Sequence, residues 1–311
     1  MFNRLINLTK KIMYKDLEVR SYVVTRIVPS QIKETVFFCS GNKQIDVSQR
    51  HCMICLDPFS VAIWLSPEQY ADGISEKPFL LFKKNGRKKA ILHLNLIEST
   101  TEENDTLLLY KAERPATFQL NPLIRFITLS FFLRNRSSSL RERKLIAALY
   151  SYPRKIIAVS YKEEGYCNIF PMDIEGHIPG SNLYILGLRN SNFTLKKILE
   201  QKKLLVADTS NADIGTIYSL GRHQSVSPPP IASFPFSTSN SELFKFPVPG
   251  FSSSYKELEI IRSRNMGYHM LLVGRILNEV NTVAEPASLC HLHLFEFVHS
   301  GYEKISNAGY N

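Results

Sequence analysis

The chain has 311 residues and a mass of 35.6 kDa, which is enough for about two domains. Hydrophobic residues make up 44% and charged residues 21%, the balance of a folded protein rather than a disordered one. No apolar run reaches the roughly 18 residues of a membrane span, and residues 1–11 lack the apolar stretch of a signal peptide. Five cysteines are too few for a disulfide scaffold, so we expect a cytoplasmic, reducing location and no membrane partner.

The first half of the chain is predicted to be β-rich, because short segments rich in Val, Ile, Phe and Tyr alternate with turn residues. These segments are Ser21–Val28, Glu34–Cys39, Cys52–Leu56, Val61–Leu65, Phe79–Phe82, Ala90–Leu96 and Leu108–Tyr110. Residues 120–149 are predicted to be helical, with the serines at 137–139 as a cap for a helix over Leu140–Tyr150. We therefore predict a β-rich N-terminal domain over residues 1–140, whose role the sequence does not assign.

The net charge of +10 lies mostly in this half, and its densest run surrounds the dipeptide Asn85-Gly86. Lysine or arginine occupies positions 83, 84 and 87–89. Because apolar segments flank the run on both sides, the pattern predicts a β-hairpin with a charged, solvated tip. The less favoured alternative is a patch that binds anions or nucleic acid; nucleic acid is not the expected partner.

The second half, residues 141–311, also reads mostly as short strands. Predicted strands are Lys155–Tyr161, Cys167–Pro171, Asn182–Leu188, Lys203–Asp208, Met270–Leu277 and Cys290–Val298. One helix is predicted to begin near Asn192, and residues 222–254, rich in Pro, Ser and Phe, are predicted to form an ordered irregular flap. The fold class is therefore mainly β, with a small barrel in residues 141–311.

A series of short motifs within residues 150–280 carries a resemblance to a known family. Pro153-Arg154-Lys155 leads into an apolar strand, Asn168-Ile169-Phe170-Pro171-Met172 follows a glycine turn, and a further strand ends on Arg189-Asn190-Ser191. Farther along, Gly267-Tyr268-His269 precedes an apolar strand that contains Gly274. In order and spacing these pieces resemble the flavin reductase-like family, whose members are FMN-binding split β-barrels.

The resemblance implies two groups of flavin-binding residues. Arg189, Asn190, Ser191, Asn192 and Thr194 would hold the phosphate at a helix N-terminus, where backbone N–H groups and the helix dipole favour anions. The alternative is that Ser191 or Asn192 only caps the helix.

Asn168, Phe170, Pro171, Met172 and Asp173 would line the flavin ring with backbone groups and an apolar wall. Here the alternative is an ordinary exit from a strand. Met172-Asp173 departs from the family, which often has a small hydroxyl or aromatic residue there. A carboxylate beside a reduced flavin would be unfavourable.

His269 is the histidine that the resemblance places near the flavin and the nicotinamide, as a positioning group rather than an obligate base. An ordinary hydrogen-bonded histidine at a strand start is the alternative. Hydride transfer is the chemistry of the cofactors, and the protein orients the two rings. The resemblance thus implies FMN as cofactor, NAD(P)H as electron donor, a homodimer and a redox partner protein.

Other signals are weaker. Cys52 and Cys55 form a CxxC pair, but they lie in a predicted strand without a second pair of ligands, so we expect buried thiols. His291 and His293 share a strand face without a matching carboxylate or thiol, and we predict no metal site. Nucleotide-binding glycine loops and hydrolase motifs are absent from the sequence.

The sequence therefore predicts a flavin reductase-like enzyme that transfers hydride from NAD(P)H to flavin. The alternative is a non-catalytic flavin-binding or electron-carrier protein. A third reading is an interaction protein whose barrel has lost its flavin.

Overall fold

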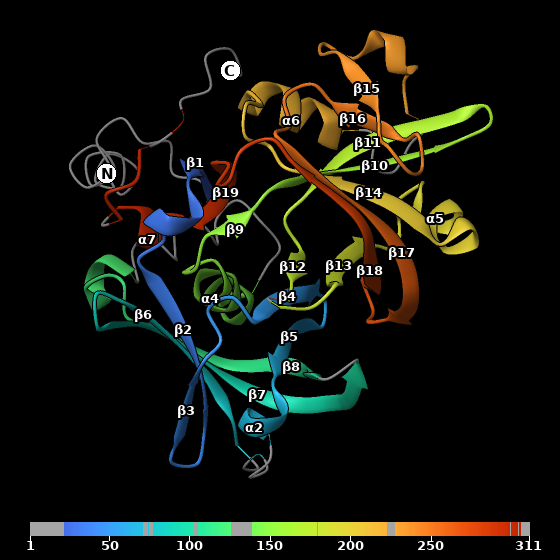
Figure 1. Cartoon of the computed structure of the whole chain (residues 1–311). Coiled ribbons are helices and arrows are strands. Elements are labelled where there is room, and N and C mark those ends of the chain that lie inside the picture. The colour runs from blue at the N-terminus through green and yellow to red at the C-terminus, as the bar shows by residue number, and fades with distance from the viewer. Residues whose placement is uncertain are drawn as a thin grey trace.

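The chain is mainly β, as predicted, and most of its strands belong to two seven-stranded sheets (Figure 1). The computed structural model describes residues 22–70, 74, 77–102, 105–125, 139–178, 180–222, 228–298, 300–303 and 305. The predicted helical stretch between residues 126 and 138 lies outside these residues, as does the N-terminal segment to residue 21. No described helix is long and apolar enough to cross a membrane.

The first sheet is an antiparallel sheet with strand order β3-β2-β6-β7-β8-β5-β4. Its strands are β2 (Glu34–Ser40), β3 (Lys43–Asp46), β4 (His51–Leu56), β5 (Phe59–Leu65), β6 (Phe79–Lys84), β7 (Arg87–Glu102) and β8 (Asp105–Thr117). Asn85 and Gly86 join β6 to β7 with φ angles of 49° and 74°. Both values are left-handed, as a tight hairpin turn requires. The predicted hairpin is therefore confirmed.

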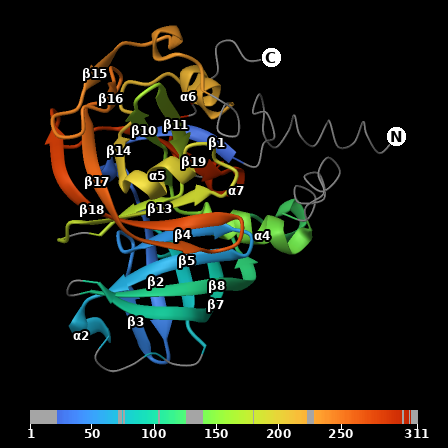
Figure 2. The ribbon, with the colours of Figure 1, turned by 90° about the vertical axis from the view of Figure 1, so that its right-hand side faces the viewer.

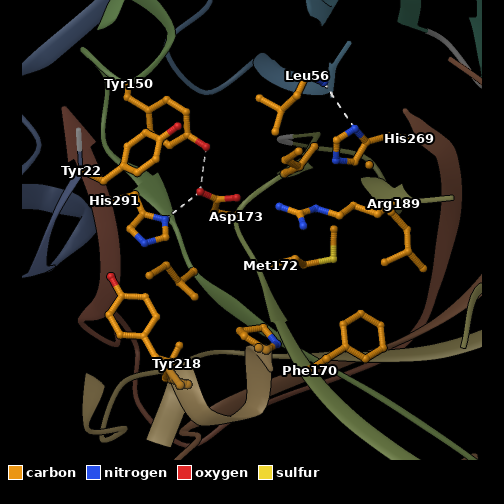
Figure 3. A pocket seen from close by; sticks show the side chains of 17 residues that line it. Tyr22, Leu56, Tyr150, Phe170, Met172, Asp173, Arg189, Tyr218, His269 and His291 are labelled. Atoms are coloured by element: carbon orange, nitrogen blue, oxygen red, sulfur yellow. Dashed lines mark hydrogen bonds and ion pairs between the residues drawn. The ribbon is translucent and has the colours of Figure 1, made fainter. Parts of the chain in front are cut away.

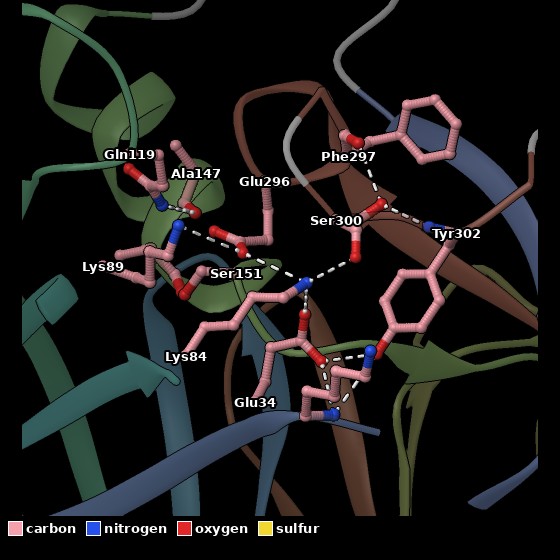
Figure 4. Close-up of polar contacts among 12 residues, drawn as sticks. Glu34, Lys84, Lys89, Gln119, Ala147, Ser151, Glu296, Phe297, Ser300 and Tyr302 are labelled. Atoms are coloured by element: carbon pink, nitrogen blue, oxygen red, sulfur yellow. Dashed lines mark hydrogen bonds and ion pairs between the residues drawn. The ribbon is translucent and has the colours of Figure 1, made fainter. Parts of the chain in front are cut away.

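The prediction of a solvated tip is wrong for Lys84. Its side chain is only 4% exposed, and its Nζ lies 2.7 Å from Glu34 Oε1 and 3.8 Å from Glu296 Oε1 (Figure 4). Lys89 lies 3.6 Å from the same oxygen of Glu296. The hairpin turns back against the C-terminal segment, which supplies partners that are distant in sequence.

The second sheet has strand order β11-β10-β14-β17-β18-β13-β12 and is strongly curled, as expected of a split barrel (Figure 1). Its strands are β10 (Ile157–Glu163), β11 (Tyr166–Met172), β12 (Glu175–His177), β13 (Leu183–Arg189), β14 (Lys203–Ala207), β17 (Ser254–Asn265) and β18 (His269–Asn281). The sequence prediction missed β17, because its alternation of polar and apolar residues follows the proline-rich segment without a break.

Two smaller sheets complete the β structure. In the first, β19 (Ser288–His293) pairs with β1 (Tyr22–Ile27) and with β9 (Arg154–Lys155). The second joins β15 (Thr238–Asn240) to β16 (Pro247–Pro249) within the predicted flap. Phe246, Val248 and Phe251 of this segment are buried, so its described part is ordered, as predicted.

The described helices are short. They include α2 (Pro67–Tyr70), α4 (Leu140–Leu149), α5 (Leu195–Gln201), α6 (Ile214–Gly221), α7 (Leu294–Phe297) and the 3₁₀ turns η1 (Pro29–Gln31) and η2 (Ile231–Ser233). The side chain of Ser139 caps α4 by accepting from the backbone N–H of Glu142, as predicted. The predicted final strand stops at His293, whose side chain caps α7 instead.

The two large sheets pack against each other (Figure 2). One hydrophobic cluster contains side chains from both, including Trp64 of β5 and Leu271 of β18. In addition, β1 reaches from the first half into the sheet of β19, and α4 packs on the first sheet. A division of the chain at residue 140 stays a prediction, and the two halves share a core.

Candidate functional site

A cavity of about 290 Å³ opens where the end of β11, the ends of β13 and β18, helix α6 and strand β19 meet (Figure 3). Six of the predicted site residues line it: Phe170, Pro171, Met172, Asp173, Arg189 and His269. The remaining lining residues are Tyr22, Leu56, Tyr150, Ile156, Ile174, Gly187, Leu188, Ile217, Tyr218, Gly221 and His291.

Strand register brings Arg189 and His269 together. They are directly opposite each other in the β13–β18 ladder, although 80 positions separate them in the sequence. Before His269, the turn at Gly267 has φ of +110°, and a Cβ there would lie 2.5 Å from the carbonyl oxygen of Asp57. Only glycine fits this approach. The turn is further held by Tyr268, whose backbone N–H donates to the same oxygen at 2.7 Å.

His269 is a neutral hydrogen-bond donor in the cavity. Its Nδ1 accepts from the backbone N–H of Leu56 at 3.3 Å, so the ring proton is on Nε2. Burial, aided by the positive charge of Arg189, lowers the pKa of His269 to about 4. The Nε2 atom faces the cavity on the same side as Arg189 (Figure 3). This wall therefore presents N–H donors to a ligand.

Asp173 lies on another side of the cavity and is held by two neighbours. Its Oδ2 accepts from His291 Nδ1 at 2.7 Å and from the hydroxyl of Tyr150 at 2.9 Å (Figure 3). Burial raises the pKa of Asp173, but these two hydrogen bonds and nearby positive charge outweigh it, and the net shift is downward. Asp173 is thus a carboxylate at neutral pH.

The rest of the cavity wall is apolar. Phe170, Pro171 and Met172 come from the end of β11, and Ile217 comes from α6. Gly187 allows close packing behind this wall, because a Cβ there would lie 2.4 Å from Ile174 Cγ2 and from the carbonyl oxygen of Ile54. A flat ring with polar edges matches a cavity that combines such a wall with charged groups on two sides.

The other five predicted residues do not line this cavity. Asn168 Nδ2 donates to Thr194 Oγ1 at 2.8 Å, and Asn192 Oδ1 accepts from the backbone N–H of Thr194 at 2.8 Å. Asn190 donates to the carbonyl oxygen of Gly267, while Ser191 is exposed. Because the polar groups of Asn168, Asn192 and Thr194 bond one another before the short helix α5, their role in phosphate binding stays a prediction.

Sequence reasoning missed four polar residues of the cavity: Tyr22, Tyr150, Tyr218 and His291. His291 was singled out only for its alternation with His293. His293 is buried elsewhere and caps α7, so the two histidines do not share a site. Among the described residues no group of three or more His, Cys, Asp and Glu side chains is placed to hold a metal ion. The described cysteines are free, and Cys52 and Cys55 are buried as predicted.

No protein-family model matches this chain, and no curated protein matches it at a significant level. Among solved structures, an FMN-binding protein from Thermus thermophilus is 16% identical, with a TM-score of 0.41 over 51% of this chain and 90% of that one. An NADH:FAD oxidoreductase from Streptomyces globisporus is 12% identical, with a TM-score of 0.43 over 52% and 92%. A flavin reductase is 13% identical, with a TM-score of 0.39 over 52% and 95%.

These structures are FMN-binding and flavin reductase proteins, the class that the sequence resemblance predicts. Their likeness to this chain is one of fold, over about half its length. With TM-scores below 0.5, the function has to be argued from the geometry of the cavity itself.

Proposed function

We propose that the chain binds a flavin, with FMN as the expected form, in the cavity beside Arg189 and His269, and that NAD(P)H reduces it there. The observation that supports the proposal is the convergence of separate sequence pieces on one cavity. Residues 170–173, Arg189 and His269 were singled out from the sequence for flavin binding, and all of them line it. From the resemblance we also propose that the chain forms a homodimer and works with a redox partner protein.

The residues of the cavity fit a flavin ring. The apolar wall from β11 suits the face of the ring, and Arg189 with the Nε2–H of His269 suits its carbonyl oxygens and the negative charge of its reduced form. A volume of about 290 Å³ is at the small end for ligand pockets, so it suits a ring system rather than a whole nucleotide. A bound flavin would supply the group that accepts hydride.

The residues of the chain would bind and orient rather than react. Arg189 would attract the anionic cofactor and stabilise negative charge on the ring. His269, neutral at pH 7, would donate from Nε2 and position the nicotinamide or a water molecule. Phe170, Pro171 and Met172 would exclude water from one side of the ring.

A non-catalytic flavin carrier is the second candidate, and Asp173 favours it. A carboxylate in the cavity opposes the negative charge that a ring gains on reduction. The two candidates differ in whether reduced nicotinamide reaches the bound flavin.

The visible absorption spectrum of the purified protein tests the proposal, first alone, then with FMN, then with NADH or NADPH under anaerobic conditions. We expect a flavin band that bleaches with a reduced nicotinamide. A band that persists would favour the carrier. No binding of added FMN would overturn the flavin proposal.

Arg189→Ala is expected to weaken FMN binding by about 1.5–3 kcal/mol, the scale of a hydrogen bond to a charged group. Titration calorimetry with FMN measures this. Arg222→Ala, on the exposed end of α6, serves as the comparison for nonspecific loss of charge. Equal affinities for the Arg189→Ala variant and the unchanged protein would remove Arg189 from the site.

His269→Ala is expected to slow flavin reduction by NAD(P)H more than it weakens FMN binding, because the imidazole positions the donor ring. Stopped-flow bleaching of the flavin band gives the rate, and calorimetry gives the affinity. Proportional loss of both quantities, or of neither, would count against a positioning role.

A further inference from the structure

Two oppositely charged side chains face the same cavity without forming an ion pair. Arg189 ends β13, Asp173 follows β11, and the guanidinium of Arg189 points toward the carboxylate across the cavity (Figure 3). Within the described part of the chain, Asp173 pairs with His291, and no ion pair joins it to Arg189. Opposite charges held apart across an apolar cavity leave room for a ligand that contacts both.

The two oxygens of Asp173 have different surroundings. Oδ2 accepts from both His291 Nδ1 and the Tyr150 hydroxyl, which fixes the carboxylate in place. Oδ1 points away from these two donors and toward the side of Arg189 (Figure 3). The cavity therefore offers one fixed acceptor, Asp173 Oδ1, opposite the guanidinium donors of Arg189.

We propose that Asp173 is a ligand-recognition residue, whose Oδ1 accepts a hydrogen bond from a ring N–H while Arg189 donates to a neighbouring ring carbonyl. This inference rests on the proposed flavin function. The ligand class is a flat cyclic imide, in which one N–H lies between two carbonyl groups, and the pyrimidine edge of the flavin ring is such an imide.

The assignment gives a role to a residue that departs from the resembling family. A carboxylate repels the ring oxygens and any ring nitrogen that carries negative charge. It attracts the imide N–H, the single donor on that edge of an oxidised flavin. Asp173 would thus select which part of the ring edge faces β11, and a ring without that N–H would be rejected, because the acceptor in the cavity would lose its partner.

Binding of lumiflavin and of its N3-methyl derivative tests this. Both are flavin rings without the ribityl phosphate, and they differ at the imide N–H alone. Their affinities are measured at pH 7 by quenching of flavin fluorescence, without any electron donor. We expect the N3-methyl ring to bind the unchanged protein at least about tenfold more weakly, the scale of one hydrogen bond to a charged acceptor.

Variants of Asp173 separate this hydrogen bond from a steric effect of the methyl group. In Asp173→Ala, which has no acceptor, the two rings should bind with similar affinities. In Asp173→Asn, an amide oxygen that keeps the bonds to His291 and Tyr150 places NH₂ in the cavity, and lumiflavin should bind at least about tenfold more weakly. Tyr302→Phe is the control outside the cavity, because it removes a hydrogen bond to Glu34 and should keep the discrimination. Circular dichroism and thermal unfolding establish that each variant is folded.

The outcomes distinguish the inference from the function on which it rests. If lumiflavin does not bind the unchanged protein, the proposed flavin site itself fails. If both rings bind it equally well, the flavin site stands and the role of Asp173 fails. If discrimination persists in Asp173→Ala, the methyl group meets some other residue and the assignment is overturned.

Discussion

Asp173 and Glu296 are two carboxyl groups that each lie near two donor side chains, and their pKa values shift in opposite directions. Asp173 has two donors within hydrogen-bond distance, at 2.7 and 2.9 Å, and its pKa falls below the ordinary value despite burial. Glu296 has two lysines, but at 3.6 and 3.8 Å, and burial raises its pKa to about 7. The pKa of these carboxyl groups therefore depends more on donors in hydrogen-bond contact than on positive charge nearby.

The difference follows from position in the fold. Asp173 lies at a cavity, with a side chain that is 20% exposed, and its donors are His291 on β19 and Tyr150, the residue that follows α4. Glu296 is fully buried in α7, and it shares Lys84 with Glu34, which has the closer contact at 2.7 Å. At Asp173 the ionised group borders a cavity. Around Lys84, Glu34 and Glu296 the charged groups are buried between distant parts of the chain (Figure 4).

Removing the buried cation should have the largest effect on stability. Lys84→Met leaves Glu34 and Glu296 without their shared partner, and we expect a loss of about 3–5 kcal/mol in the free energy of unfolding. Denaturant unfolding followed by circular dichroism measures it. A loss below 1 kcal/mol would mean that water already solvates this cluster.

Two companion variants make that measurement specific. Lys88→Met changes an exposed lysine of the same turn and should stay within about 0.5 kcal/mol. Adding Glu34→Gln to Lys84→Met should recover part of the loss, because the amide can still accept from the hydroxyl of Tyr302 without carrying an unpaired charge.

Removing a hydrogen bond to Asp173 should cause a smaller loss of stability. Tyr150→Phe removes one of the two donors to Asp173 and should lower the free energy of unfolding by about 1.5 kcal/mol, the lower end for a charged hydrogen bond, because the carboxylate is partly solvated. The same unfolding experiment applies. Tyr166→Phe breaks an uncharged bond to Thr194 and should lose less. If the two variants lose the same free energy of unfolding, the charge on Asp173 does not strengthen its hydrogen bond to Tyr150.

Much of the fold was predictable from local patterns. The β6–β7 hairpin followed from Asn85-Gly86 between apolar runs, and the start of α4 followed from its serine cap. Lys84 could not be placed correctly, because the sequence does not show that Ser300 and Glu296 would approach the turn from more than 200 positions away. Strand β17 was missed for a local reason, since a proline-rich stretch precedes it.

The candidate site was only partly predictable. Arg189 and His269 were selected from separate motifs, and their cross-strand pairing appears only in the register of β13 and β18. Asp173 was noted as a departure, but its partners Tyr150 and His291 lie on α4's C-terminal end and on β19, outside the motif. The polar residues before α5 were chosen for a helix N-terminus, whereas Thr194 bonds Asn168 through its hydroxyl and Asn192 through its backbone N–H.

Changing each carboxyl to an amide gives the smallest effect and the sharpest comparison. At pH 5 the Glu296 carboxyl, with a pKa near 7, is already protonated, so Glu296→Gln should change stability by no more than about 0.5 kcal/mol.

A folded-state pKa above the ordinary value adds stability at low pH that is lost as pH rises through 7. The unchanged protein should therefore lose stability relative to Glu296→Gln between pH 5 and 8, by at most about 1.4 kcal/mol per pH unit. For Asp173 the carboxyl itself contributes no pH dependence over this range, because it is ionised in both the folded and the unfolded protein. Parallel flat profiles would mean that the lysines, despite their distance, keep Glu296 ionised.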